Sequence, residues 1–132
     1  MSKSVLYTAN TSTQPFVATG TIVNFGTPVR RYGNNVNVSG GNVVVDGIGY
    51  YNLDTNLTVE ATGAGTLLVQ VFKDGVAITG ASATITVAAD TTYAVTIPAI
   101  VRENCCCEST ITVVVSGVAG NVTNAAMVIE KE

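Results

Sequence analysis

The sequence predicts an all-β sandwich or barrel, and three observations lead to this fold class. Val and Thr together supply 41 of the 132 residues, and these β-branched residues favour strands over helices. Residues that build surface helices are scarce, since the chain has only 6 Lys and Arg residues and 2 Met. Short strand-forming runs recur at intervals of about ten residues between Gly, Asn and Asp, which is the pattern of a sandwich or barrel.

The expected strands alternate with turn residues along the whole chain. In the first half they cover residues 4–10, 16–18, 21–25, 29–32, 36–39, 42–45 and 49–61. In the second half they cover residues 66–73, 76–79, 82–88, 92–101, 109–116 and 121–130. Gly40-Gly41 and Asp74-Gly75 are two-residue hairpin signals. With no helix and no linker, residues 1–132 are expected to form a single domain of about ten strands.

The facing of the strands indicates a contact outside the domain. Leu67, Val69 and Val71 share one face of their strand, while Leu68 and Phe72 lie on the other, so this strand is apolar on both sides. A monomeric sandwich shows cleaner polar alternation on its solvent faces. With only 11% charged residues in the chain, we expect one sheet to pack against another copy of the chain.

The first strand is expected near the sheet edge or at the base of the trimer. Val5 and Tyr7 share one of its faces, but residues 11–14 carry no apolar group, and Pro15 lacks the amide that a ladder needs. We therefore interpret residues 1–14 as an edge segment that is available for docking.

Composition excludes several classes of function. The chain has no His and no Trp, which removes the usual general base and the usual metal ligand, so we expect no enzyme and no cofactor. The net charge of −3 and the pI of 4.7 argue against a nucleic-acid partner. No apolar run has the roughly 18 residues of a membrane span, and no secretory signal is seen, so we expect synthesis in a reducing cytosol and no membrane partner.

Residues 47–87 resemble the TNF/C1q-like jelly-roll family. The segment Gly49-Tyr50-Tyr51-Asn52-Leu53 is similar to the family's central Gly-x-Tyr-x-apolar strand. A glycine-flanked turn and an apolar strand follow, and Phe72-Lys73-Asp74-Gly75-Val76 matches its D-G-V hairpin. The resemblance implies a jelly-roll β-sandwich of about ten strands that assembles as a homotrimer.

Stalkless proteins of this type resemble bacteriophage head-fibre or capsid-decoration proteins. The resemblance implies a structural protein on the virion surface, made in the bacterial host cytoplasm, with capsid or other virion proteins as partners. Host-surface glycans are a further partner class that fits this interpretation. The alternative is a trimeric spore- or cell-surface adhesion protein of the same fold. A small carbohydrate-binding module ranks last, because the chain has no Trp and only eight aromatic residues, several of which the core requires.

Two groups of residues are candidates for contacts. The candidate trimer interface or core consists of Tyr50, Tyr51, Leu68 and Phe72. Tyr50 and Tyr51 must point to opposite faces of their strand, so one enters the core and the other faces outward. Cys105 and Cys107 are a candidate thiol site, but the C-x₂₋₄-C pairs of structural zinc sites are missing. The simpler interpretation is that the three consecutive cysteines fill apolar space and are dispensable for folding.

Overall fold

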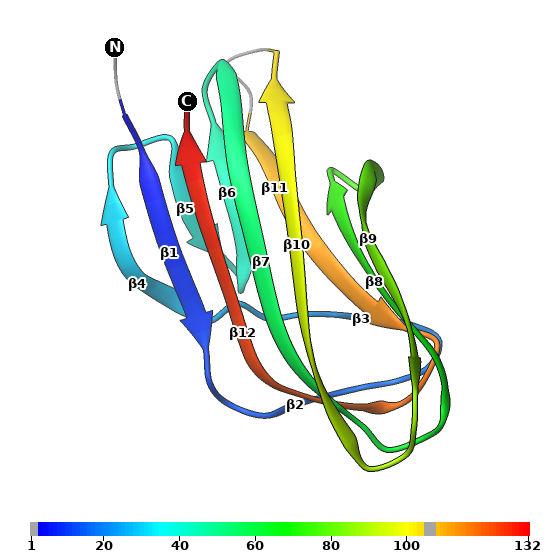
Figure 1. The fold of residues 1–132 in the computed structure, drawn as a ribbon. Helices are drawn as coiled ribbons and strands as arrows, with labels where there is room; N and C mark the ends of the chain where they lie inside the picture. Colours follow the sequence, from blue (N-terminus) through cyan, green and yellow to red (C-terminus); the bar gives the residue numbers. More distant parts are fainter. Residues whose placement is uncertain (1–2, 105–107) are drawn as a thin grey trace.

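Two antiparallel sheets form a sandwich in the computed structural model, which describes residues 3–104 and 108–132 (Figure 1). Sheet A contains, in order, β10 (Thr91–Glu103), β7 (Gly49–Ala61), β12 (Gly120–Lys131), β1 (Val5–Asn10) and β4 (Thr27–Tyr32), with the short β2 (Gln14–Phe16) also beside β12. Sheet B contains, in order, β5 (Val36–Ser39), β6 (Asn42–Asp46), β11 (Glu108–Ser116), β8 (Gly65–Lys73) and β9 (Val76–Val87), with the short β3 (Thr21–Ile22) beside β11. The predicted all-β class is confirmed.

Most expected strands are present with small differences at their ends, and one pair is fused. The runs expected at residues 76–79 and 82–88 form the single strand β9. Gly80 lies between them with a φ of 83°, and the register against β8 shifts between Gln70 and Phe72. A bulge thus absorbs the glycine, so the chain continues as one bent strand where a turn was expected.

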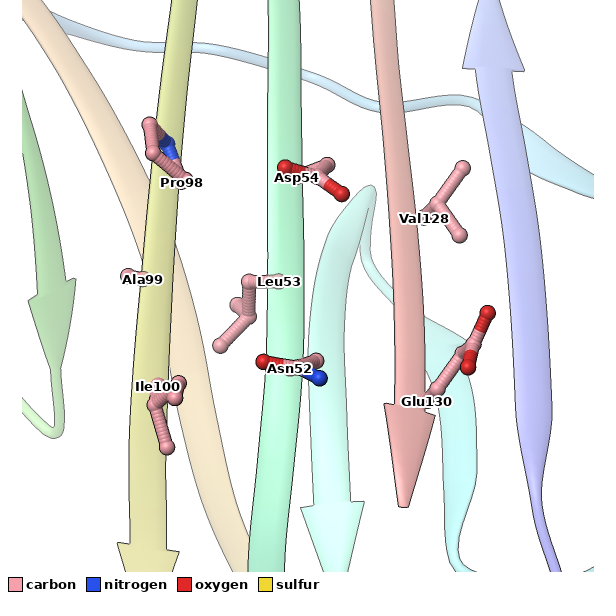
Figure 2. A pocket seen from close by; sticks show the side chains of 8 residues that line it. All are labelled: Asn52, Leu53, Asp54, Pro98, Ala99, Ile100, Val128 and Glu130. Atoms are coloured by element: carbon pink, nitrogen blue, oxygen red, sulfur yellow. The ribbon is translucent and has the colours of Figure 1, made fainter. Parts of the chain in front are cut away.

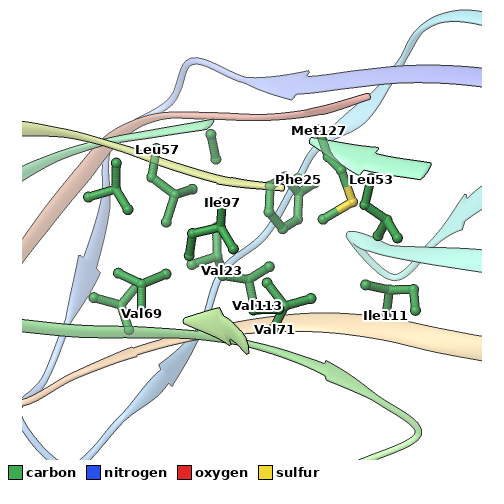
Figure 3. Packing of buried hydrophobic residues seen from close by; sticks show 14 of the residues in the cluster. Val23, Phe25, Leu53, Leu57, Val69, Val71, Ile97, Ile111, Val113 and Met127 are labelled. Atoms are coloured by element: carbon green, nitrogen blue, oxygen red, sulfur yellow. The ribbon is translucent and has the colours of Figure 1, made fainter. Parts of the chain in front are cut away.

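The core lies between the sheets and is built from alternate residues of each long strand. Along β7 every second residue from Tyr51 to Ala61 is buried, and the residues between them face outward. Branched aliphatic side chains from both sheets interdigitate with Phe25 and Met127 in this layer (Figure 3). Because a strand rotates its side chains by half a turn per residue, this alternation holds one face of each sheet inside.

The first strand lies near a sheet edge, although it is not the edge strand itself. β1 lies one strand in from the edge and pairs with β12 on one side and β4 on the other. Ser4, Leu6 and Thr8 on its inner face have no exposed surface. The reason is that the C-terminal strand supplies a partner for β1, which the local sequence does not reveal. Docking through residues 1–14 stays a prediction, and deletion of this segment would also take away a partner strand of β12.

Two threonine hydroxyl groups in the core of sheet A differ in their hydrogen bonding. The Thr8 hydroxyl lies 2.8 Å from the carbonyl oxygen of Phe25 and 3.0 Å from that of Thr27. The Thr55 hydroxyl, on a side chain that is 1% exposed, has no hydrogen-bond partner among the described residues. Burial of a hydroxyl without a partner costs stability.

We predict that Thr55→Val raises the free energy of unfolding by about 1 kcal/mol, because it removes the unpaired hydroxyl and keeps the shape of the side chain. Urea denaturation provides the measurement. The matched change Thr8→Val should lower stability by about 1–2 kcal/mol, since it leaves the buried carbonyl oxygen of Phe25 without this donor. Equal effects of the two changes would contradict this account.

Candidate interaction surface

The residues that sequence analysis selected for an interface lie in three different places. Tyr51 is buried in the core, whereas Tyr50 is 52% exposed on the outer face of sheet A. Leu68 and Phe72 are half-buried on the outer face of sheet B. These four residues therefore form no common patch. Cys105 and Cys107 lie outside the described residues.

Tyr51 closes the connection between β6 and β7. Its hydroxyl lies 2.8 Å from the carbonyl oxygen of Gly47 and 3.2 Å from that of Asp46. Burial raises the pKa of Tyr51 above its ordinary value of 10.0, and the negative charges of Asp46 and Glu103 raise it further. The Tyr51 side chain is therefore a neutral phenol in the folded protein.

Glu103 ends β10 in a buried position. Its side chain is 4% exposed, and a carboxylate oxygen accepts a hydrogen bond from the Ser109 hydroxyl near the start of β11. This bond links sheet A to sheet B at the point where the chain crosses between them. The pairing of β10 with β7 extends to Glu103, which lies opposite Gly49.

Exposed apolar side chains gather on the outer face of sheet A, which we call the A face. The strand register aligns two neighbouring rows of side chains across it, and each row crosses five strands. The first row contains Tyr32, Val5, Glu130, Asn52 and Ile100. The second row contains Arg30, Tyr7, Val128, Asp54 and Pro98. Tyr32 is 71% and Ile100 63% exposed, at opposite ends of the first row.

A shallow groove of 460 Å³ runs between β10, β7 and β12 on the A face (Figure 2). Pro98 and Ile100 form its apolar side, and Val128 lies across from them. Asn52, Asp54 and Glu130 supply polar groups along the floor and the far side. The Asn52 amide donates a hydrogen bond of 2.6 Å to a carboxylate oxygen of Glu132. The first row is therefore apolar at both ends, whereas the second row has Arg30 at one end and Pro98 at the other.

Tyr50 extends the A face toward the end of β10. The guanidinium carbon of Arg102 lies 5.6 Å from the centre of the Tyr50 ring, which is cation–π distance. Arg30 and Arg31, the basic pair seen in the sequence, both lie on the exposed strand β4. Arg31 donates from Nε to the carbonyl oxygen of Val36 at 2.8 Å, so it fastens β4 to β5 across the edge of the sandwich.

The described residues show no cluster of three or more His, Cys, Asp or Glu side chains that could hold a metal ion. In the same residues, no helix is long and apolar enough to cross a membrane.

Comparison with known proteins identifies the fold. No protein-family model and no curated protein match the chain. Among solved structures, murine APRIL superposes with a TM-score of 0.76 at 17% identity, covering 99% of this chain and 100% of that one. The globular domain of zebrafish complement 1qA superposes with a TM-score of 0.67 at 12% identity over 96% and 94% of the two chains. The vertex protein P5 of PRD1 superposes with a TM-score of 0.64 at 10% identity over 98% and 96%.

The fold is a TNF/C1q-like jelly roll. This confirms the fold class that the segment of residues 47–87 implied. All three identities are too low to show more than the fold, so they assign no partner and no activity to this chain.

We predict that Tyr51→Phe lowers the free energy of unfolding by about 1 kcal/mol at neutral pH, because the hydroxyl bonds to Asp46 and Gly47 are lost. The pKa of Tyr51 is raised in the folded state, so the wild-type phenol stabilises the fold below pH 10 and loses this contribution as the pH rises further. The advantage of the wild type over the variant should shrink above that pH. Urea denaturation at several pH values measures both effects.

The matched control is Tyr50→Phe, which alters an exposed ring on the same strand and should change stability by less than about 0.5 kcal/mol. A constant difference between the wild type and Tyr51→Phe from neutral to strongly alkaline pH would contradict the assignment of the buried phenol.

Proposed function

We propose that the chain is a non-catalytic structural protein of a bacteriophage particle, a trimeric head-fibre or capsid-decoration protein. The observation that carries the proposal is the A face, where Tyr7 and Tyr32 lie beside Arg30 toward one end of the rows and Pro98 and Ile100 lie at the other end. The likeness of the fold to the PRD1 vertex protein supports a place on a virion. The likeness to APRIL and complement 1qA is at least as close and supports the fold alone.

The two apolar ends of the A face suit a ring of identical subunits. One end consists of Tyr7 and Tyr32 on β1 and β4, and the other consists of Pro98 and Ile100 on β10. A contact between unlike patches of identical chains closes into a ring when the rotation between neighbours permits it. In the proposed trimer, the β10 end of one subunit packs on the tyrosines of the next.

The polar middle of the A face fits the same arrangement. The polar groups between the two apolar ends belong to Asp54, Asn52 and Glu130. In the proposed trimer they would stay hydrated or make hydrogen bonds near the ring axis. Each apolar end would then make its own contact, with these polar groups along its border.

We predict that the wild type has three times the 13.5 kDa mass of one chain in solution. Ile100→Lys should raise the dissociation constant of the trimer at least about tenfold, because it places a charge in the apolar contact. Light scattering after size-exclusion chromatography at micromolar concentration provides the measurement.

The matched control is Ile48→Lys. Ile48 is 58% exposed, close to the exposure of Ile100, but it lies in the turn between β6 and β7. This variant should keep the trimer mass. A monomeric wild type, or equal dissociation of both variants, would overturn the proposed interface.

Phage particles produced with and without the gene test whether the protein is part of the virion. We expect the chain in gradient-purified particles and a loss of surface projections in negative-stain images when the gene is deleted. Absence of the chain from purified particles would overturn the virion role. Recovery on spores or on cell surfaces would instead support the adhesion protein that the sequence left as the alternative.

A further inference from the structure

The four strands at the sheet edges differ in how they are protected against pairing with another strand. Free edges are usually blocked by charge, by proline or by short length. β10 contains Pro98 and ends in Arg102 and Glu103. β4 contains Pro28 and two arginines, and β5 has only 4 residues. The fourth edge strand, β9, has 12 residues with no charge and no proline.

The part of β9 that can accept a partner is its second half. The bulge at Gly80 bends the strand, but Ser82 to Val87 pair in regular register with Gly65 to Gln70 of β8. The other side of this segment is the free edge of sheet B. Its unpaired backbone groups are a template for a further strand.

Side chains along this segment also have no neighbouring strand on the free-edge side. Ala83 and Ile85 face the core and pack against it, yet both remain half-buried. Thr84 and Thr86 are exposed on the outer face of sheet B. An added strand would cover the two apolar side chains and extend the threonine face.

We propose that β9 pairs antiparallel with β9 of a second copy, so that the two B sheets become continuous. A twofold axis through Thr84 places it opposite the partner's Thr84. In this register Ala83 lies opposite the partner's Ile85, and Ser82 opposite the partner's Thr86. Each pair lies on one side of the sheet, because opposite residues of an antiparallel pair point to the same face.

The chemistry of β9 favours its own copy as the occupant. Self-pairing around a twofold axis brings the residue on the axis, Thr84, close to its own copy, so a charge at that position would repel its equivalent. β9 has no such charge. Threonine pairs and small-with-branched apolar pairs are favourable cross-strand neighbours, and this register supplies both.

The pairing uses a different sheet from the A face and does not rest on the proposed trimer. A contact of six residues is at the weak end of protein interfaces, so association is expected between about 10 µM and 1 mM. If the trimer forms, pairing through β9 joins one trimer to another. Several such contacts between the same assemblies then raise the overall affinity.

The test uses the full chain carrying Ile100→Lys, in which the A-face contact is weakened. Sedimentation velocity over a concentration series should show a monomer–dimer equilibrium. Adding Thr84→Lys should raise the dimer dissociation constant about tenfold or more, because two ammonium groups would meet across the axis. The control is Thr13→Lys, an exposed loop position outside the strands, which should leave the dimer unchanged.

Amide hydrogen exchange identifies the contact directly. Protection of the amides at residues 82–87 should increase with protein concentration, and Thr84→Lys should abolish this increase. Concentration-independent exchange there, or a dimer that resists Thr84→Lys, would overturn the pairing. Failure of the wild type to form a trimer would leave this result unaffected, so the two proposals fail separately.

Discussion

The alternation of side chains along β7 is the constraint on which the rest of the fold depends. This strand pairs over its full length with β10 on one side and over nearly all of it with β12 on the other. A slip of one residue would move Tyr51, Leu53 and Leu57 to the outside and bring Asp54 and Asn56 into the core. One strand therefore fixes both the inner layer and the rows of the A face.

The local strand pattern was predictable because it depends on neighbouring residues. The strand expected at residues 49–61 has the observed ends. The Asp74-Gly75 turn was also expected, and both residues adopt positive φ values of 51° and 83°. Glycine, and to a lesser degree aspartate, tolerates that conformation, which is why the pair is a reliable hairpin signal.

The position of β1 was not predictable in the same way. Val5 pairs with Glu130, at the other end of the chain, and no local pattern encodes such a pairing. The A face has the same origin. Tyr32, Tyr7 and Ile100 come from three strands that share one sheet face only because of the strand order. The sequence showed an excess of apolar side chains on the strand of residues 66–73, but it did not show that more exposed rings would collect on the opposite sheet.

Separate surfaces for two kinds of contact have a geometric consequence. A ring made through the A face uses unlike patches and closes on itself, whereas pairing through β9 uses like patches and adds one partner to each subunit. If the twofold axes of β9 are perpendicular to the ring axis, two trimers close into a hexamer. If they are parallel to it, each trimer gains three neighbours and the pairing extends into a layer. If both proposed contacts form, the direction of the twofold axis relative to the ring axis therefore determines whether the chain forms a closed particle or a coat.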